Sequence, residues 1–391
     1  MTLSSFALPH IQRGLAIPED EIGALFALLR FGTVFSLALA VLSDRYGRRR
    51  LLIASVVGCA LCNLATALAW DGLAFAWLQM GARFFLGAQV LLAVVVVTEE
   101  LAAENRGFGL GMLAALSGMG GAFTLFVYAF VDRLPFGWRS LYVIGAFGLL
   151  CVPWLLRALP ETRRFTDHND RASLLGSRGS LWEPLRDLVQ RHRLRLAILI
   201  AVVLPVSIIL DPASVFISKH LQDDLGYTPA QVGLLIAGCG IAAPLGNVLT
   251  GSISDRFGRR PITALMSLLL SVGTALFYFG VGPFWMVVGL TVLFISFGGL
   301  GVLHAALAAE LFPTSLRSTA TGVREAVATL GASLGLGLLS VVFGAAGGNI
   351  SSMAWLLVLT PIAPIALLWM PETAGLELEE IQGDEAIDRV D

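Results

Sequence analysis

Residues 254–261 read SDRFGRRP and residues 43–50 read SDRYGRRR, so nearly the same eight-residue stretch occurs twice in the chain. The separation of 211 residues recurs elsewhere. It pairs Gly87 with Gly298, Glu99 with Glu310, Arg106 with Arg317, Gly111 with Gly322, and Pro160-Glu161-Thr162 with Pro371-Glu372-Thr373. Basic loops alone can match by coincidence, but one shared offset at several places indicates an internal repeat. We therefore expect two structurally related halves.

The composition of the chain is that of a membrane protein. Of its 391 residues, 56% are hydrophobic and only 14% are charged, and the mean hydropathy is +0.80. A soluble domain carries about 25% charged residues. A helix needs around 20 apolar residues to cross the hydrocarbon core, where its backbone groups must be satisfied internally. Because the chain has no pattern of short alternating strands, we expect an all-α membrane protein.

Eleven long apolar segments follow one another along the chain. They cover residues 21–43, 51–70, 74–98, 108–130, 138–157, 196–218, 231–252, 261–280, 284–308, 318–343 and 351–370. We therefore predict an N-terminal helical bundle at 1–157, a cytoplasmic central loop at 158–194, a C-terminal bundle at 195–373 and a cytoplasmic tail at 374–391. SLWEPLRDLVQRHRLR, at 180–195, is either an amphipathic helix on the membrane surface or a solvated linker helix.

Basic residues give the expected orientation. Most of the 26 Lys and Arg residues lie in alternate loops, among them those at 45–50, those at 256–260, and Arg317 and Arg324. The opposite loops hold Arg13, Arg133, Arg139 and Lys219. By the positive-inside rule, we expect the Arg-rich loops and the C-terminus to be cytoplasmic and the protein to lie in the plasma (inner) membrane.

The repeat also bears on the start of the chain. LPHIQRGLAIPEDEIG at 8–23 aligns with SKHLQDDLGYTPAQVG at 218–233. Residue 1 then corresponds to a position well inside the helix that opens the second half. We therefore expect a shortened first helix, from a mis-set start codon or a natural truncation, beside eleven complete helices.

These motifs resemble the major facilitator superfamily, and within it the sugar-porter-related, metabolite:proton symporter branch. The superfamily's G-x-x-x-D-R-x-G-R-R signature is complete from Gly251 to Arg260, whereas the first copy begins with Ala40. PETRRF at 160–165 and PETAGLELEEI at 371–381 resemble hallmarks of the branch. The resemblance covers essentially the whole chain. It implies the major facilitator fold, with two pseudo-symmetric six-helix bundles.

Charged residues in the repeated loops suggest a gate. A carboxylate at one helix end can accept hydrogen bonds from guanidinium groups or from the N–H groups of another helix. Such pairs can form in one state of alternating access and break in the other, or they can merely fix topology and loop structure. The expected cytoplasmic latch comprises Asp44, Gly47, Arg48, Glu99, Arg106, Asp255, Gly258, Arg259, Glu310 and Arg317.

Ionisable residues inside apolar segments are candidates for substrate or proton binding, because they are costly in lipid. Arg83, in GARFFLGAQ, matches a position at which the family keeps an Arg implicated in coupling, and a cation there favours an anionic solute. Asp211 precedes Pro212, which can break the helix locally. Arg30 and His304 are weaker candidates. Each of the four can instead be a structural residue held by hydrogen bonds.

Absent motifs narrow the function. The sequence has no P-loop, nucleophile elbow or H-E-x-x-H, so we expect no enzyme, metal or cofactor. AILIAVVLPVSIILDPASVF, at 197–216, lacks the Gln and Asn of hexose-transporting sugar porters, which disfavours a sugar. GLGMLAALSGMGGAFTLF, at 109–126, lacks the Gly-Pro element of drug/proton antiporters, which weakens efflux.

The sequence thus predicts a secondary active transporter that takes up a small organic metabolite, in particular an organic anion, by proton symport. Its expected partners are the solute, protons and the lipid bilayer, with no nucleic acid and with a monomeric state. The proton gradient would supply the energy. Two alternatives stay open: an efflux transporter of the same fold for drug-like or hydrophobic compounds, and a non-transporting or degenerate membrane protein.

Overall fold

The computed structural model describes residues 3–101, 103–159, 182–313, 316–346, 348–370 and 372, and every regular element in these residues is a helix. Ten described segments are long and apolar enough to cross a membrane. They are Arg48–Thr66, Gly72–Val97, Gly111–Tyr128, Trp138–Ala158, Arg193–Asp224, Pro229–Phe257, Arg259–Phe279, Pro283–Glu310, Thr319–Gly344 and Ile350–Leu367. Helix α3 (Ile22–Tyr46) covers the remaining predicted segment. The predicted all-α membrane fold is confirmed.

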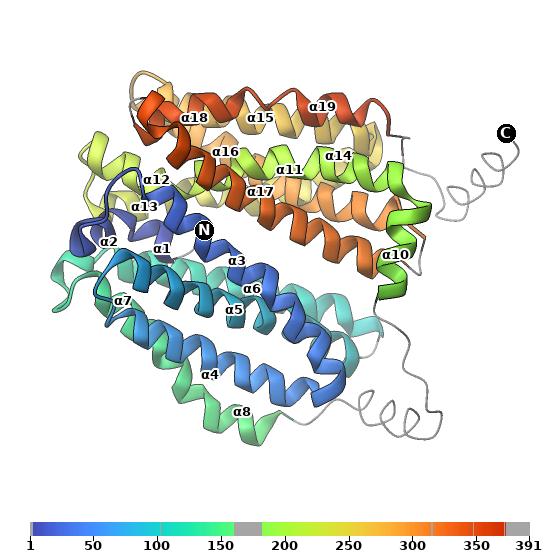
Figure 1. Cartoon of the computed structure of the whole chain (residues 1–391), viewed down its shortest axis with the longest axis horizontal. Coiled ribbons are helices and arrows are strands. Elements are labelled where there is room, and N and C mark those ends of the chain that lie inside the picture. Colours follow the sequence, from blue (N-terminus) through green and yellow to red (C-terminus); the bar gives the residue numbers. More distant parts are fainter. Residues whose placement is uncertain are drawn as a thin grey trace, which may run out of the picture. The chain divides into compact units, whose positions relative to one another are not determined.

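The chain forms two compact units, and unit 1 comprises Met1–Arg178 and Val215–Leu234. Its long helices α3, α4 and α5 lie along one another, with α5 packed on both neighbours (Figure 1). The helices of unit 1 besides α3 are α1 (Leu3–Phe6), α2 (Leu8–Leu15), α4 (Arg48–Thr66), α5 (Gly72–Glu100), α6 (Ala103–Tyr128), η1 (Val131–Arg133), α7 (Trp138–Gly145), η2 (Ala146–Cys151), α8 (Val152–Ala158), α12 (Ile217–Lys219) and the π-helix η3 (His220–Asp224).

Unit 2 comprises Gly179–Ser214 and Leu235–Asp391. Within it, α16 packs against both α14 and α15 (Figure 1). Its helices are α10 (Trp182–Arg191), α11 (Arg193–Val215), α13 (Pro229–Gly240), α14 (Ala242–Phe257), α15 (Arg259–Phe279), α16 (Pro283–Glu310), α17 (Arg317–Ala346), α18 (Asn349–Leu357) and α19 (Ile362–Leu367). Helix α11 ends, and α13 begins, in residues that group with unit 1.

The two copies of the repeated loop have the same backbone conformation. Gly47 precedes α4 with φ 100° and ψ 141°, and Gly258 precedes α15 with φ 101° and ψ 144°. A positive φ of this kind is readily adopted only by glycine. A Cβ at Gly258 would also lie 2.5 Å from a carboxylate oxygen of Glu372. The repeat is therefore present in the backbone torsions as well as in the sequence.

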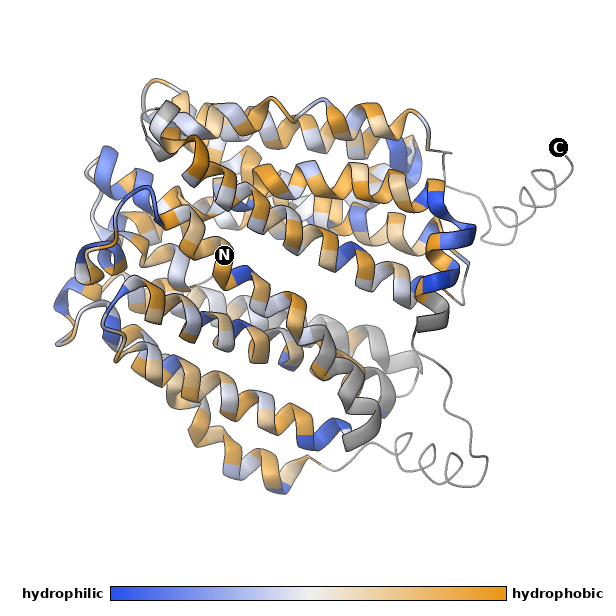
Figure 2. Ribbon diagram, in the orientation of Figure 1, coloured by the Kyte–Doolittle hydropathy of each residue, from blue (hydrophilic) through white to orange (hydrophobic). Residues whose placement is uncertain are grey.

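Apolar side chains cover the outside of the helices as well as their interior. Hydrophobic residues run along the helices, whereas hydrophilic ones gather mainly at helix ends and connections (Figure 2). Leu68, Leu234 and Trp369 are each more than 60% exposed. A soluble protein rarely exposes so much contiguous apolar surface, but lipid tails solvate it. This surface agrees with a multi-pass membrane protein.

Two expectations about individual residues are corrected. Pro212 does not break its helix: α11 runs through it to Val215, and the irregularity comes at Phe216 and in the following π-helix η3. Arg324, counted above among the loop charges, lies in α17 within the span Thr319–Gly344. In both places the apolar residues on either side of the charge or proline are sufficient to continue the helix.

The amphipathic segment of the central connection is helical. It forms α10, whose Leu188 is fully buried, and α10 packs against α17. Next to it, the His192 ring meets the Phe312 ring edge-on, and Arg195 donates a hydrogen bond of 3.1 Å to the Leu311 carbonyl. The residues that follow α10 thus contact the connection between α16 and α17.

The close contact between α14 and α16 leads to a prediction about Gly298. A Cβ at Gly298 would lie 2.1 Å from the Ala243 carbonyl oxygen, whereas a Cβ at Gly301, on the same helix, meets nothing within 4 Å. We expect Gly298→Ala to destabilise the protein by about 1–3 kcal/mol through overpacking. Thermal unfolding in detergent should show a lower midpoint for this variant and an unchanged one for Gly301→Ala. Equal midpoints would contradict the packing.

Candidate functional site

The signature loop of unit 2 forms a connected set of charges, here called the Arg259 cluster: Ser254, Asp255, Arg259, Glu310 and Glu372. The Arg259 guanidinium lies 2.7 Å from Asp255 and 3.2 Å from Glu310, and it also donates to the Ser254 hydroxyl. Asp255 is four residues before Arg259, so both lie on one side of the chain where α14 passes into α15. Arg259 thereby ties the ends of α14 and α16 to the start of α15.

Glu372 caps the N-terminus of α15. Its two carboxylate oxygens accept hydrogen bonds from the backbone N–H groups of Arg259, at 2.6 Å, and Arg260, at 3.2 Å. The first N–H groups of a helix have no partner within the helix, and its dipole attracts a negative charge there. The PET sequence therefore has a definite local role in unit 2, because it supplies the cap.

The structure joins three members of the expected latch, Asp255, Arg259 and Glu310, within unit 2, with Gly258 in the same turn. Gly47 and Arg48 occupy the equivalent turn of unit 1, and both are buried. Arg317 begins α17. The side chains of Asp44, Glu99 and Arg106 lie outside the described residues. A latch that opens and closes during transport stays a prediction.

A second charged set, the Lys219 cluster, lies at the other end of the helices of unit 1. It comprises Gln12, Arg13, Glu19, Lys219 and Asp223. Lys219 is only 8% exposed, and its ammonium nitrogen lies 2.7 Å from Gln12, 2.9 Å from Asp223 and 3.0 Å from Glu19. Arg13 pairs with the other oxygen of Asp223 at 3.1 Å. This cluster ties α2 to the residues that follow α11.

Buried hydrogen bonds add further contacts at the end of unit 1 that contains the Lys219 cluster. Ser218 donates to the Phe6 carbonyl at 2.6 Å, and Gln222 donates to both Ser218 and Tyr128. His10 lies 3.0 Å from Asp132 and meets the Tyr128 ring edge-on. Residues of α1, α2, α6, α12 and η3 therefore close this end of unit 1 with polar contacts.

A buried polar network occupies the interior of unit 1 near Arg83. Gln79 accepts from Ser4 at 3.0 Å and donates to Asn63 at 3.3 Å and to Thr66 at 2.9 Å. Tyr142 donates to Ser4 at 3.2 Å. These side chains come from α1, α4, α5 and α7, so the network links the helices that surround α5.

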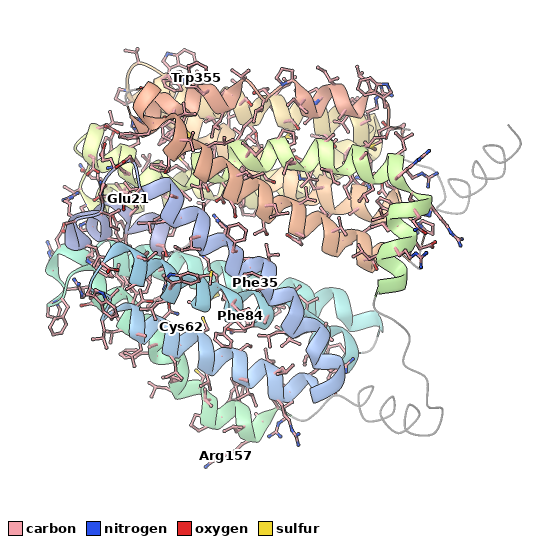
Figure 3. The ribbon with its side chains drawn as sticks, viewed as in Figure 1. Glu21, Phe35, Cys62, Phe84, Arg157 and Trp355 are labelled. Atoms are coloured by element: carbon pink, nitrogen blue, oxygen red, sulfur yellow. The ribbon has the colours of Figure 1, made fainter. Side chains whose placement is uncertain are left out.

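Arg83 lies one helical turn from Gln79 along α5 and is 7% exposed. Residues four apart share one face of a helix, so Arg83 extends the face that carries the network. The neighbouring Phe84 and the nearby Cys62 mark the middle of unit 1, between Glu21 at one end and Arg157 at the other (Figure 3). Arg83 is thus a buried cation at membrane depth.

The other three candidate residues for substrate or proton binding lie in three different helices. Arg30 is half-buried in α3, and Asp211 is half-buried in α11, where its backbone carbonyl accepts from Ser214 at 2.8 Å. His304 is 5% exposed in α16. Within unit 1, the polar network one helical turn from Arg83 contains residues that sequence reasoning did not select as site residues, namely Ser4, Gln79 and Tyr142. Their only sequence signal is a polar residue within an apolar run.

An all-helical membrane protein with two related halves and charged, repeated loops is the architecture of a secondary transporter. The sequence matches the Major Facilitator Superfamily over residues 1–217 and 208–386. The chain therefore belongs to this superfamily, and the resemblance seen in the motifs is confirmed. It is a multi-pass membrane transporter.

Curated relatives are transporters of small metabolites. The chain is 27% identical over 360 residues to the 3-(3-hydroxy-phenyl)propionate transporter of Escherichia coli (strain K12), covering 90% of this chain and 82% of the relative. It is 25% identical over 403 residues to the probable 4-methylmuconolactone transporter of Cupriavidus pinatubonensis, with 97% and 89% covered. It is 25% identical over 412 residues to the proline/betaine transporter of Salmonella typhimurium, with 96% and 76% covered.

Solved structures share the fold at low sequence identity. A D-xylose-proton symporter superposes with a TM-score of 0.71 at 18% identity, covering 96% of this chain and 94% of that one. A nucleoside transporter superposes with a TM-score of 0.76 at 14% identity, covering 94% of each chain. At these identities, the superpositions establish the major facilitator fold.

The cap of α15 can be tested directly. We expect Glu372→Ala to cost about 1–2 kcal/mol, because two backbone donors and the helix dipole lose their partner. Amide hydrogen exchange should speed up at Arg259 and Arg260, and the unfolding midpoint should fall. Glu21→Ala removes an exposed carboxylate and serves as the control. Unchanged exchange at the two arginine amides would show that Glu372 is no cap.

Proposed function

We propose that this transporter takes up a small organic carboxylate together with protons, by alternating access. The observation that carries the proposal is the buried guanidinium of Arg83 in α5, at membrane depth and one helical turn from the polar network of Gln79. A buried cation in a transmembrane helix is costly and marks a solute or ion pathway by default. A guanidinium binds a carboxylate through two parallel hydrogen bonds, which gives it both affinity and orientation.

The names of the relatives support this class of solute. Propionates, proline and betaine all carry a carboxylate, although the rest of these molecules differs. A site could bind all of these solutes if one Arg binds the carboxylate and apolar residues contact the rest of each molecule. The aromatic ring of a hydroxyphenylpropionate also fits the apolar character of the helices around Arg83.

Proton coupling follows from the charge of the solute. Uptake of an anion against an inside-negative membrane potential is opposed by about 2.3 kcal/mol per charge at 100 mV. Movement of one proton with each carboxylate makes the step electroneutral, and the pH gradient then drives it. Our candidate for the proton carrier is Asp211, an acidic residue within α11.

The two charged clusters are proposed as gates at opposite ends of the helices. By the positive-inside rule, the Arg-rich end with Asp255 and Glu310 faces the cytoplasm, and the Lys219 cluster faces outward. Ion pairs between separate helices form bistable contacts, which a rocking motion can break and remake. Opening of the outer end would then require the contacts of Lys219 and Asp223 to separate.

The role of Arg83 in carboxylate transport is tested in membrane vesicles. With an imposed pH gradient, acid outside, the vesicles should accumulate labelled 3-(3-hydroxyphenyl)propionate, and a protonophore should abolish accumulation. Arg83→Ala should reduce the initial rate at least tenfold, because the carboxylate loses its cation. Arg133→Ala removes an exposed Arg and should retain the normal rate.

Three results would overturn the proposal. Accumulation of carboxylates that is equal in wild type and Arg83→Ala would remove Arg83 from the pathway. Export of hydrophobic dyes, with no carboxylate uptake, would favour the efflux reading instead. Competition by uncharged amides as strong as that by the acids would exclude carboxylate recognition.

The outer gate is tested by thiol labelling. In a chain whose Cys59, Cys62, Cys151 and Cys239 are replaced by serine, Ser218→Cys provides a buried reporter next to Phe6. An impermeant maleimide should label it slowly in right-side-out vesicles. Lys219→Met should raise the labelling rate several-fold, because Glu19 and Asp223 lose their shared cation. Arg133→Met is the control at the same end, and no acceleration in Lys219→Met would argue against the gate.

A further inference from the structure

Unit 2 contains a charged pair inside a membrane-spanning helix that the mechanism above does not use. Arg324 and Glu325 lie in α17, within the span Thr319–Gly344, and their side chains form an ion pair. The Arg324 side chain is 13% exposed, whereas that of Glu325 is 51% exposed. The Nε atom of Arg324 is buried and has no hydrogen-bond partner. The guanidinium therefore has one side paired and another unsatisfied.

His304 lies in α16, which packs against α17. It is 5% exposed, and its Nε2 atom is buried without a hydrogen-bond partner. His304 stands six residues before the end of α16, and Arg324 stands seven residues after the start of α17. At 1.5 Å per residue, both are about 10 Å from the connection between these packed helices, and so at the same depth.

Nothing in the fold requires these residues. At the repeat offset, His304 corresponds to Ala93, Arg324 to Leu113 and Glu325 to Ala114. The first half thus builds the same helices with apolar residues at all three positions. An Arg, a Glu and a His in apolar surroundings, present in one half only, indicate a function beyond folding.

The exposure of Glu325 shows which environment this side of α17 meets. A carboxylate in a membrane span faces lipid only at a large cost, so charged residues there turn toward the bundle interior or a water-filled path. The half-exposed Glu325 therefore marks a hydrated side of α17, and Arg324 is its ion-pair partner. Both unsatisfied nitrogen atoms are buried in this structure, so a solute reaches them only when the helices move apart.

We propose that Arg324 and His304 form a second binding site for the carboxylate group of the transported solute, in addition to Arg83, with Glu325 as the competing internal anion. Arg324 offers Nε–H together with its terminal N–H groups, the fork that binds a carboxylate in bidentate fashion. His304 donates from Nε2 when that nitrogen carries the proton. Glu325 holds Arg324 in the unoccupied state, and the solute displaces it. The inference rests on the proposed carboxylate transport.

Equilibrium binding to the purified full-length chain in detergent tests this site without transport. The probe is labelled 3-phenylpropionate, and 3-phenylpropionamide is the uncharged competitor. Arg324→Gln should weaken binding of the acid at least tenfold, and His304→Ala about threefold. Arg256→Gln makes the same exchange at an exposed arginine of unit 2 and should bind normally.

Glu325→Gln gives the decisive result, because its expected effect has the opposite sign. Removal of the competing carboxylate should tighten binding of 3-phenylpropionate several-fold, and this outcome does not depend on whether Arg324→Gln folds. An unchanged or weaker affinity in Glu325→Gln would overturn the inference. So would normal affinity in a folded Arg324→Gln protein.

The failure of this inference is distinguishable from failure of the proposed function. If Arg83→Ala abolishes uptake while Glu325→Gln leaves affinity unchanged, carboxylate transport stands and the site in unit 2 is wrong. If the wild-type chain binds neither the acid nor its competitor, both proposals are wrong. Tighter binding in Glu325→Gln, lost again when Arg324→Gln is added, supports the site.

Discussion

Lipid offers no hydrogen bonds to the backbone, and the rest of this structure depends on that constraint. Every described element is a helix because a helix satisfies its own N–H and C=O groups within one segment. The groups at helix ends remain, and here side chains and polar loops supply their partners. Glu372 at the start of α15 and Asp71 at the start of α5, which accepts from the Ala74 N–H at 2.6 Å, show two such solutions.

The same constraint explains how the polar residues are distributed. Side chains that cannot reach water must find one another, so Ser4, Gln79 and Tyr142 form a connected network rather than isolated pairs. Charged residues that can reach water gather at helix ends, as Lys219 and Arg259 do. Arg83 and Arg324 belong to neither group, and this is why they carry the functional proposals.

Much of the fold could be predicted from the sequence, because membrane spans are local. Long apolar runs located the helices, and one repeat offset revealed the two related halves. The site could be predicted less well, because its contacts join residues far apart in the chain. Nothing near Lys219 in sequence indicates Glu19 or Gln12 as a partner. Arg324 was misplaced because a charge near the end of an apolar run resembles a loop residue.

The repeat also shows which parts of the two halves have diverged. The loop positions Asp44 and Asp255 kept their identity, whereas the positions of His304 and Arg324 have apolar counterparts in the first half. We expect features shared by both halves to serve the movement that both halves make. We expect features present in one half to serve something that only one half does, such as recognition of an asymmetric solute.

The matched torsions of Gly47 and Gly258 have an evolutionary consequence. If the halves arose by duplication of one ancestral gene segment, this turn was already present before the copies separated. Each copy then accumulated its own substitutions in the surrounding helices, yet the φ angles of the two glycines still agree to within a degree. The turn is therefore older than any solute specificity of the present chain. New transport functions could evolve in the surrounding helices without changes to these two loops.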